Sequence, residues 1–96
     1  RGLERTWSMR YTVEYTSKAL KSLKKLDKPV LLMIKSWIEK NLIGTTEPRR
    51  HGKGLTSNRS GQWRYRVGDY RIIADIEDEK LIILVVEVEH RSRVYK

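Results

Sequence analysis

The spacing of apolar residues changes twice along this chain, and these changes constrain its fold more than any other feature. Apolar residues alternate with polar ones over Arg10–Tyr15, recur every three or four positions between Lys18 and Asn41, and alternate again from Gln62 to Val88. Alternation is typical of a half-buried strand, whereas the longer period is typical of an amphipathic helix. The chain therefore predicts a strand, then a helical region, then a second group of strands.

The helical region divides into two helices at Asp27-Lys28-Pro29, because Asp27 can cap a helix and proline suits its first turn. The first helix is predicted over Lys18–Leu26, capped by Thr16 or Ser17, and the second from about Val30 to Asn41, ended by Gly44. Their predicted apolar stripes are Leu20, Leu23 and Leu26 in the first helix and Leu31, Ile34, Trp37 and Ile38 in the second. A connection this short favours an antiparallel helical hairpin.

Three strands are predicted after a polar loop over Thr45–Gly61. They cover Gln62–Val67, Tyr70–Ile76 and Leu81–Val88, with turns at Gly68-Asp69 and Glu77–Lys80. The last strand is the most apolar and is expected to be the central strand of the sheet. The predicted fold class is α+β, with an N-terminal strand, an antiparallel helical hairpin and a three-stranded antiparallel meander. The helices would cover one face of a small sheet and leave the other face open.

Size and composition predict one domain over residues 9–96 of the 96-residue chain. Residues 1–8 precede Met9 and lack the apolar region of a signal peptide, so we expect an expression-derived or disordered extension there.

The absence of cysteine excludes disulfides and thiolate metal sites. The longest apolar run, Leu81–Val86, has the length of a strand rather than of a membrane span. We expect a cytoplasmic protein that needs no metal or other cofactor.

The charge of the chain is strongly positive, because 21 lysines and arginines face 12 acidic residues for a net charge of +9. Such an excess suits a polyanion such as RNA, or an acidic protein partner. From Pro48 to Arg71 the only acid is Asp69, and the cations are Arg49, Arg50, Lys53, Arg59, Arg64, Arg66 and Arg71.

Strand geometry predicts that part of this charge converges. Arg64 and Arg66 are two residues apart and should share a face, and a hairpin would bring Arg71 of the next strand close to Arg66. The guanidinium group presents a planar fork of donors that matches phosphate oxygens. The alternative is a solvated strand face, on which the arginines pair with Asp75, Glu87 and Glu89.

The C-terminal segment HRSRVY holds a second group of candidate residues. His90 and Arg91 should point to opposite faces of the last strand, and Tyr95 follows four residues later. Histidine is available as an acid or base near neutral pH, and His51 of the loop is a weaker candidate for that role.

The run G-x-W-R-Y-R-V-G-D-Y-R-I, followed by an acidic turn, an apolar strand and V-x-H-R-x-x-V-Y, resembles the RelE/ParE superfamily of bacterial toxin–antitoxin modules. The resemblance covers Met9–Lys96. It implies a toxin of one of two kinds, either a RelE-like endoribonuclease that cleaves mRNA, typically in the ribosomal A site, or a ParE-like inhibitor of DNA gyrase without nuclease activity. A nucleic-acid-binding protein without chemistry is a third alternative.

The resemblance also implies site residues, which favour the RelE-like branch. Arg64 and Arg66 stand where RelE-like nucleases often have lysines, and Arg71, Arg91 and Tyr95 match the strand arginine, the last-strand arginine and the C-terminal tyrosine. Arginine does not act as a base, so Tyr95, His90 or one of Glu87 and Glu89 would take the proton. Attack by the RNA 2′-hydroxyl on the scissile phosphate would then need no metal.

The resemblance further implies partners. We expect a cognate acidic, RelB-like antitoxin, mRNA and ribosomal RNA as ligands, contact with operator DNA only through the antitoxin, and no membrane. The residues expected to bind RNA and the ribosome are Lys18, Lys21, Lys24 and Lys25 of the first helix and Arg49, Arg50, Lys53 and Arg59 of the loop.

Overall fold

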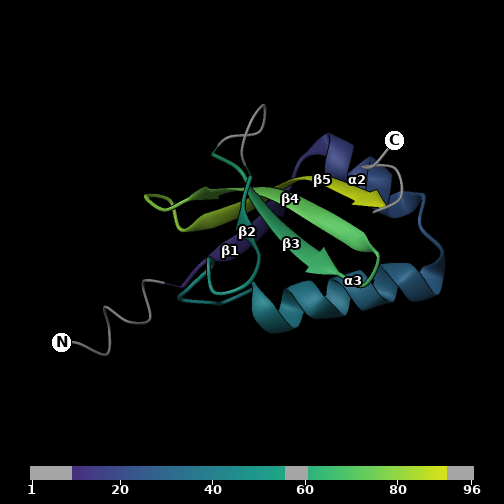
Figure 1. Cartoon of the computed structure of the whole chain (residues 1–96), viewed down its shortest axis with the longest axis horizontal. Coiled ribbons are helices and arrows are strands. Elements are labelled where there is room, and N and C mark those ends of the chain that lie inside the picture. The colour runs from purple at the N-terminus through teal and green to yellow at the C-terminus, as the bar shows by residue number, and fades with distance from the viewer. Residues whose placement is uncertain (1–9, 56–60, 91–96) are drawn as a thin grey trace.

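The computed structural model describes residues 10–55 and 61–90, which form two helices and five strands (Figure 1). In chain order these are β1 (Thr12–Tyr15), α2 (Ser17–Lys24), α3 (Lys28–Asn41), β2 (Lys53–Gly54), β3 (Trp63–Val67), β4 (Tyr70–Glu77) and β5 (Ile82–His90). The predicted α+β class and order of elements are confirmed.

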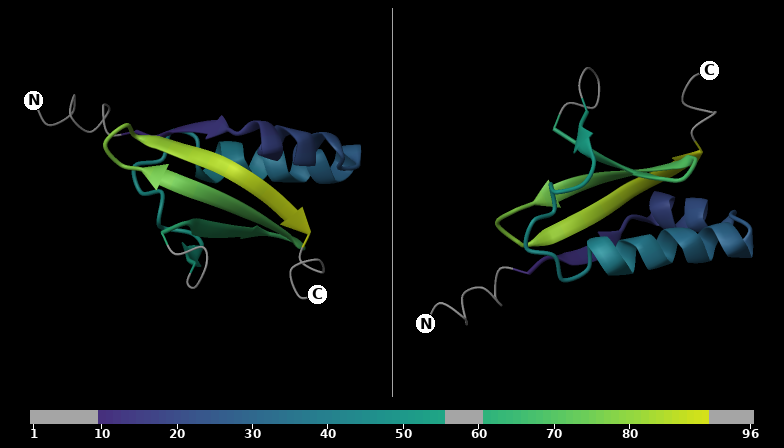
Figure 2. Two further views of the ribbon diagram at one scale, coloured as in Figure 1. Left: turned by 90° about the horizontal axis from the view of Figure 1, so that it is seen from above. Right: turned by 60° about the horizontal axis from the view of Figure 1, so that its bottom comes forward.

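The five strands form one sheet with the order β1-β5-β4-β3-β2. The first strand runs parallel to β5, and all other neighbours are antiparallel. Both helices lie on one side of this sheet (Figure 2). The other side, here called the open face, carries no helix. The strand that was expected to be central, β5, is an interior strand, but the central strand is β4. Neither helix in the described part of the chain is long and apolar enough to span a membrane.

The helices begin close to the predicted positions. Thr16 caps α2, since its Oγ1 accepts a hydrogen bond from the backbone N–H of Ala19 at 3.1 Å. Asp27 occupies the N-cap position of α3, but its side chain makes no capping bond, contrary to expectation. The predicted stripe of α2 is also wrong at Leu20, which is 46% exposed. Ala19, next to it on the helix, is buried instead.

The core lies between the helices and the sheet. Its fully buried side chains include Ile34 and Ile38 of α3, which confirms the predicted stripe of the second helix. In β3 the side chain of Tyr65 is buried and that of Arg66 is exposed, as alternation predicts. Burial of apolar surface on this side therefore fixes the arginines of β3 on the open face.

The predicted loop contains a short strand that the sequence did not indicate. Lys53 and Gly54 form β2 and pair with Arg64 and Trp63 of β3. The segment before it is anchored from the same strand, because the Tyr65 hydroxyl donates to the Pro48 carbonyl oxygen and Trp63 Nε1 to that of His51, both at 2.6 Å. These contacts hold the edge of the sheet, where Lys53 lies.

The buried Tyr65 hydroxyl makes stability depend on alkaline pH. Burial raises the pKa of Tyr65 far above its usual value, whereas an unfolded tyrosine ionises near pH ~10. Stability is thus fully present below pH ~10 and falls as pH rises toward the folded pKa, by up to about 1.4 kcal/mol per pH unit. Tyr65→Phe should weaken this fall and lower the free energy of unfolding near pH ~7 by about 1–3 kcal/mol, because the buried Pro48 carbonyl loses its partner.

Urea unfolding of both proteins at several pH values would check this expectation. The two proteins differ only in this hydroxyl, so the difference between their two curves of unfolding free energy against pH reports on Tyr65. Parallel curves above pH ~10 would contradict the assignment.

Candidate nucleic-acid interface

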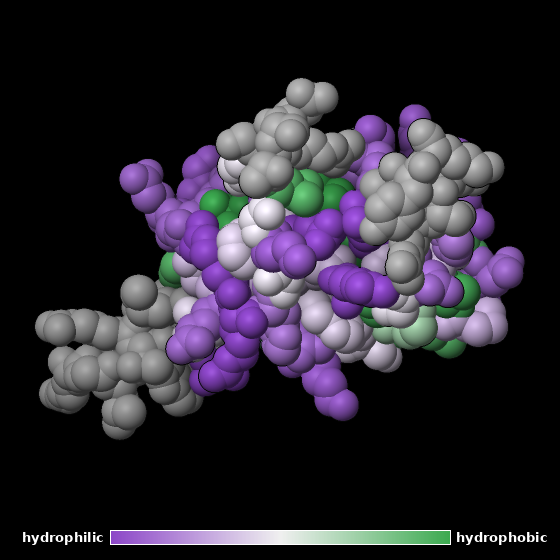
Figure 3. All heavy atoms as spheres, viewed as in Figure 1, coloured by the Kyte–Doolittle hydropathy of each residue, from purple (hydrophilic) through white to green (hydrophobic). Residues whose placement is uncertain are grey.

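Four cationic side chains converge on one pocket of the open face. This pocket has a volume of about 230 Å³ and is lined by Lys53, Arg64, Arg66, Gly68, Asp69, Tyr70 and Arg71. We call it the basic pocket. Asp69, the only acid between Pro48 and Arg71 in the sequence, is the one carboxylate among these lining residues, and hydrophilic side chains predominate over this face of the molecule (Figure 3). The pocket has the charge and the donor groups that a phosphate requires.

The strand register explains how the cations come together. Arg66 lies directly opposite Arg71 in the β3–β4 hairpin, and Lys53 of β2 lies opposite Arg64. Like charges that face each other across a sheet destabilise it. Such a conflict between local preference and observed residue type is expected where a site serves function rather than stability.

Carboxylates border the basic pocket on the side of β5. The register sets Glu89 opposite Arg71 and Glu87 opposite Ile73. Glu87 forms an ion pair with Lys18 of α2, with 3.6 Å between Nζ and Oε2. Glu87 is one of the carboxylates that the alternative interpretation of the sequence paired with an arginine, and Lys18 is a partner that this interpretation did not include.

Arg49 takes part in a structural contact that the sequence did not reveal. Its two terminal nitrogens each donate to one oxygen of Asp78 at 3.0 Å, and Asp78 Oδ1 also accepts from the Tyr11 hydroxyl at 2.6 Å. The Arg49 guanidinium beside it holds the pKa of Asp78 below its usual value. Arg49 was expected to bind RNA, and the structure gives it a contact within the protein, since two of its donors bond this carboxylate. It thus helps to fix the segment that leads to Lys53.

The remaining predicted RNA-binding residues are spread over the surface. Arg50 forms an exposed ion pair with Glu47, with 3.7 Å between Nε and Oε1. Lys21, Lys24 and Lys25 are exposed on α2, on the helix side of the molecule. The structure brings Lys53, Arg64, Arg66 and Arg71 together and does not bring these other residues to the same pocket.

A second pocket lies at the end of the sheet, and His90 belongs to it rather than to the basic pocket. This end pocket has a volume of about 530 Å³ and is lined by Ser22, Lys25, Leu26, Tyr70, Glu87, Val88, Glu89 and His90. The ring of His90 packs edge-on against that of Tyr70, with 4.9 Å between centroids. Tyr70 lines both pockets, a role that its sequence position did not indicate.

Three predicted residues, Arg59, Arg91 and Tyr95, lie outside the described residues, as does the predicted extension over residues 1–8. Within residues 10–55 and 61–90 there is no group of three or more histidine and acidic side chains that could hold a metal ion.

The known proteins and the protein family that this chain resembles are all of one kind. Residues 13–95 match the family described as ParE toxin of type II toxin-antitoxin system, parDE. Toxin RelG of Mycobacterium tuberculosis is 33% identical over 88 residues, which cover 92% of this chain and 99% of that protein. The toxin–antitoxin complex RelBE2 of the same species contains a chain that is 32% identical, with a TM-score of 0.75 over 85% of this chain and 99% of that one. The isolated RelE toxin of E. coli is 25% identical, with a TM-score of 0.66 over 88% of this chain and 90% of that one.

Proposed function

This chain belongs to the ParE toxin family of type II toxin–antitoxin systems, within the RelE/ParE superfamily, and we propose that it acts as an endoribonuclease that cleaves mRNA on the ribosome. The observation that carries the proposal is the basic pocket, in which Arg64, Arg66, Arg71 and Lys53 surround a space suited to phosphate. The RNA itself supplies the nucleophile, its 2′-hydroxyl. The protein then has to align this group with the phosphorus and stabilise the charge of the transition state.

In the proposed reaction Arg66 and Arg71 clamp the scissile phosphate from two strands. Their forks donate to its non-bridging oxygens and stabilise the added negative charge of the pentacoordinate phosphorane. The bond from the 2′-oxygen to phosphorus forms, and the bond from phosphorus to the 5′-oxygen breaks. The products are a 2′,3′-cyclic phosphate and a 5′-hydroxyl. Arg64 and Lys53 extend the positive surface toward the neighbouring phosphate.

Two protons move in this reaction, one from the 2′-hydroxyl and one to the leaving 5′-oxygen. By similarity to the RelE-like pattern of the C-terminal segment, we assign the first transfer to Tyr95; Arg91 stabilises the leaving 5′-oxygen, which takes its proton from water. Glu87 and Glu89 are alternative acceptors because they border the basic pocket. His90 faces the end pocket and is therefore a weaker candidate than it was on sequence alone.

The partner that restrains this activity would be an acidic, RelB-like antitoxin. One similar structure is a toxin–antitoxin complex, and the net charge of +9 suits an acidic chain. An antitoxin that covers the basic pocket would block access of RNA to it. Exposed cations of α2, together with Arg50, would contact ribosomal RNA through its phosphates, and operator DNA would be contacted only through the antitoxin.

The second candidate function is inhibition of DNA gyrase, which the resemblance to the ParE-like branch implies and with which the match to a family of ParE toxins agrees. A gyrase inhibitor needs a protein-binding surface but no phosphate clamp. The basic pocket therefore favours the nuclease, whereas the family match alone fits both.

Primer extension on messages from cells that express this toxin would separate the two functions. The nuclease predicts new 5′ ends inside coding sequences, placed in step with the reading frame. It also predicts that purified toxin leaves gyrase supercoiling unchanged. Intact messages combined with inhibited supercoiling would overturn the proposal in favour of the second candidate.

A further inference from the structure

We propose that the end pocket is a binding site for one nucleobase of the RNA, adjacent to the phosphate in the basic pocket, and that Tyr70 provides the surface on which this base stacks. The inference rests on the proposed nuclease function, because it assigns the neighbouring nucleotide of the same substrate. It also names a residue that would decide which base is accepted next to the cut.

The two pockets are adjacent because they share a wall. Tyr70 is the first residue of β4, directly after the Gly68-Asp69 turn, and its side chain lines both spaces. Its partners across the sheet are Val67 of β3 and His90, the last residue of β5. The pockets thus meet at the end of the sheet, where a strand of RNA held by its phosphate can pass from one to the other.

The charges that line the two pockets differ. Four cations and one carboxylate line the basic pocket. The end pocket is lined by Glu87 and Glu89 and by one cation, Lys25, and Glu87 also pairs with Lys18. The positive charge that favours a phosphate is therefore concentrated in the first pocket, whereas the carboxylates of the second can accept hydrogen bonds from an uncharged group that carries donors. Nucleobases with amino or imino groups meet this description.

The end pocket also has the shape and the surface that a base requires. Its volume of about 530 Å³ lies within the ~300–1,000 Å³ of typical small-molecule sites. Leu26 and Val88 add apolar surface to the aromatic one. The rings of His90 and Tyr70 pack at an interplanar angle of 87°, and this contact supports the tyrosine ring in its position. Stacking on such a ring is how single-stranded RNA is commonly bound.

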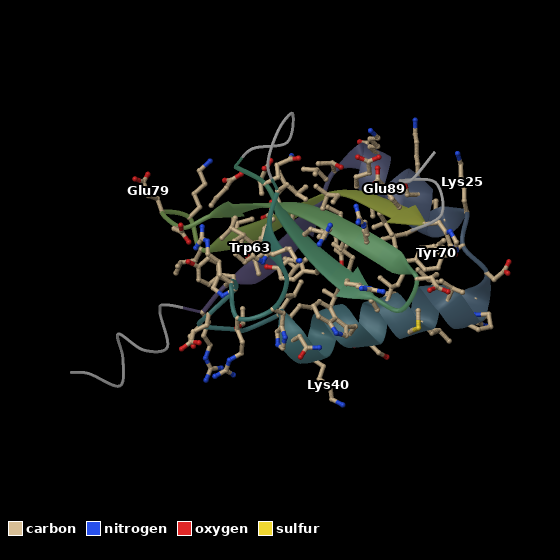
Figure 4. All side chains as sticks on the ribbon, in the orientation of Figure 1. Lys25, Lys40, Trp63, Tyr70, Glu79 and Glu89 are labelled. Atoms are coloured by element: carbon tan, nitrogen blue, oxygen red, sulfur yellow. The ribbon has the colours of Figure 1, made fainter. Side chains whose placement is uncertain are left out.

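Figure 4 shows the residues concerned at one end of the molecule. Tyr70 from β4, Lys25 from the end of α2 and Glu89 from β5 lie there, whereas Glu79 lies at the opposite end. Segments far apart in the sequence thus build this site jointly.

Removal of the aromatic ring is the first test. Tyr70→Leu is expected to lower kcat/KM for cleavage roughly 5- to 100-fold, the range found when one base loses its stacking partner. The bases found next to the cut should also become more evenly distributed. Tyr70→Phe keeps the ring and is expected to retain both the rate and the preference. Tyr15→Leu, which removes another partly buried tyrosine from β1, serves as the matched control and should change neither.

A change in base preference separates binding from folding, because a general loss of stability lowers cleavage at all sites alike. An unchanged distribution of cut sites in Tyr70→Leu would overturn the inference and leave the nuclease function standing. Absence of cleavage by the wild type would instead remove the proposed function.

The second test measures binding without catalysis. Ring resonances of Tyr70 and His90 in the purified toxin are followed by NMR during titration with a nucleoside, a nucleoside 3′-monophosphate and inorganic phosphate. The inference predicts that the first two shift both rings, whereas inorganic phosphate, which binds in the basic pocket, leaves the ring of His90 unshifted because His90 lines only the end pocket. Equal shifts of the His90 ring with all three compounds, or no shift with the nucleoside, would contradict a base site here.

Discussion

Replacement of Arg66 with alanine is expected to slow mRNA cleavage about 100-fold or more, since removal of one donor to a developing anion commonly costs this much. Arg71→Ala should have an effect of the same size, because the two side chains lie opposite each other in the hairpin and would hold the same phosphate. The double variant should lose less than the product of the single effects, because residues that act as a unit are not additive. Single-turnover cleavage of message on programmed ribosomes measures all three.

Although Arg66→Ala is expected to lose activity, its stability is expected to rise or to stay unchanged. Arg66 is exposed and faces another cation, so its removal relieves repulsion across the strands. The free energy of unfolding should thus stay within about 0.5 kcal/mol of the wild-type value or rise. Loss of activity without loss of stability is the expected signature of a residue kept for function.

Two further variants sharpen this prediction. Lys40→Ala removes the same charge from α3, where Lys40 points away from the open face (Figure 4), and should leave cleavage unchanged. Arg66→Lys keeps the charge but loses the planar fork, so partial activity would show that the geometry of the donors matters. Equal losses in Arg66→Ala and Lys40→Ala would mean that net charge alone governs activity, and the phosphate clamp would then be abandoned.

The order of elements and the convergence of Arg64, Arg66 and Arg71 were predictable from sequence for the same reason. Both depend on local periodicity and on a two-residue turn at Gly68-Asp69, which together set the register of the β3–β4 hairpin. Once one face of β3 is buried, its arginines must lie on the opposite face. The prediction that Leu20 is buried was wrong, because leucine and alanine at neighbouring helix positions give a weak pattern. The packing of α2 against β5 decided that Ala19 rather than Leu20 is buried.

The rest of the candidate site depends on contacts between distant segments, which periodicity does not encode. Asp78 is 29 residues from Arg49 and 67 from Tyr11, yet the three side chains join through hydrogen bonds. Asp78 lies within a run of acidic residues that looks like an ordinary turn. The two residues of β2 are too few to show alternation, so Lys53 could be named as a cation but not placed beside Arg64.

The position of Lys53 depends on the residue just before it, and Gly52→Ala is expected to lower cleavage about tenfold or more. A methyl group at Gly52 would lie 2.1 Å from the Arg64 carbonyl oxygen and 2.9 Å from Trp63 Nε1. Neither neighbour can yield easily, because one is backbone of β3 and the other donates to the His51 carbonyl oxygen. The chain around β2 must therefore move away from β3. A displacement of ~1 Å at a group that positions substrate can cost as much as 100-fold in rate.

Gly44→Ala is the matched control for this prediction. Gly44 and Gly52 have φ values of +79° and +80°, so alanine meets the same unfavourable backbone region at both, at a cost of about 1–2 kcal/mol. No atom lies within 4 Å of the added methyl group at Gly44. The difference between the two variants thus isolates the close approach of Gly52 to β3. Gly44→Ala should lose some stability and keep its cleavage rate.

Lys53→Ala shows whether the displacement of the chain in Gly52→Ala affects residues other than Lys53. If Gly52→Ala moved only the lysine, both variants would have the same cleavage rate. A larger loss in Gly52→Ala is expected, because Arg64 pairs with Lys53 across the strands and its backbone oxygen takes the direct clash. Activity in Gly52→Ala equal to that of Gly44→Ala would show that the edge of the sheet plays no part in holding RNA, and the basic pocket would then be reduced to the three arginines of β3 and β4.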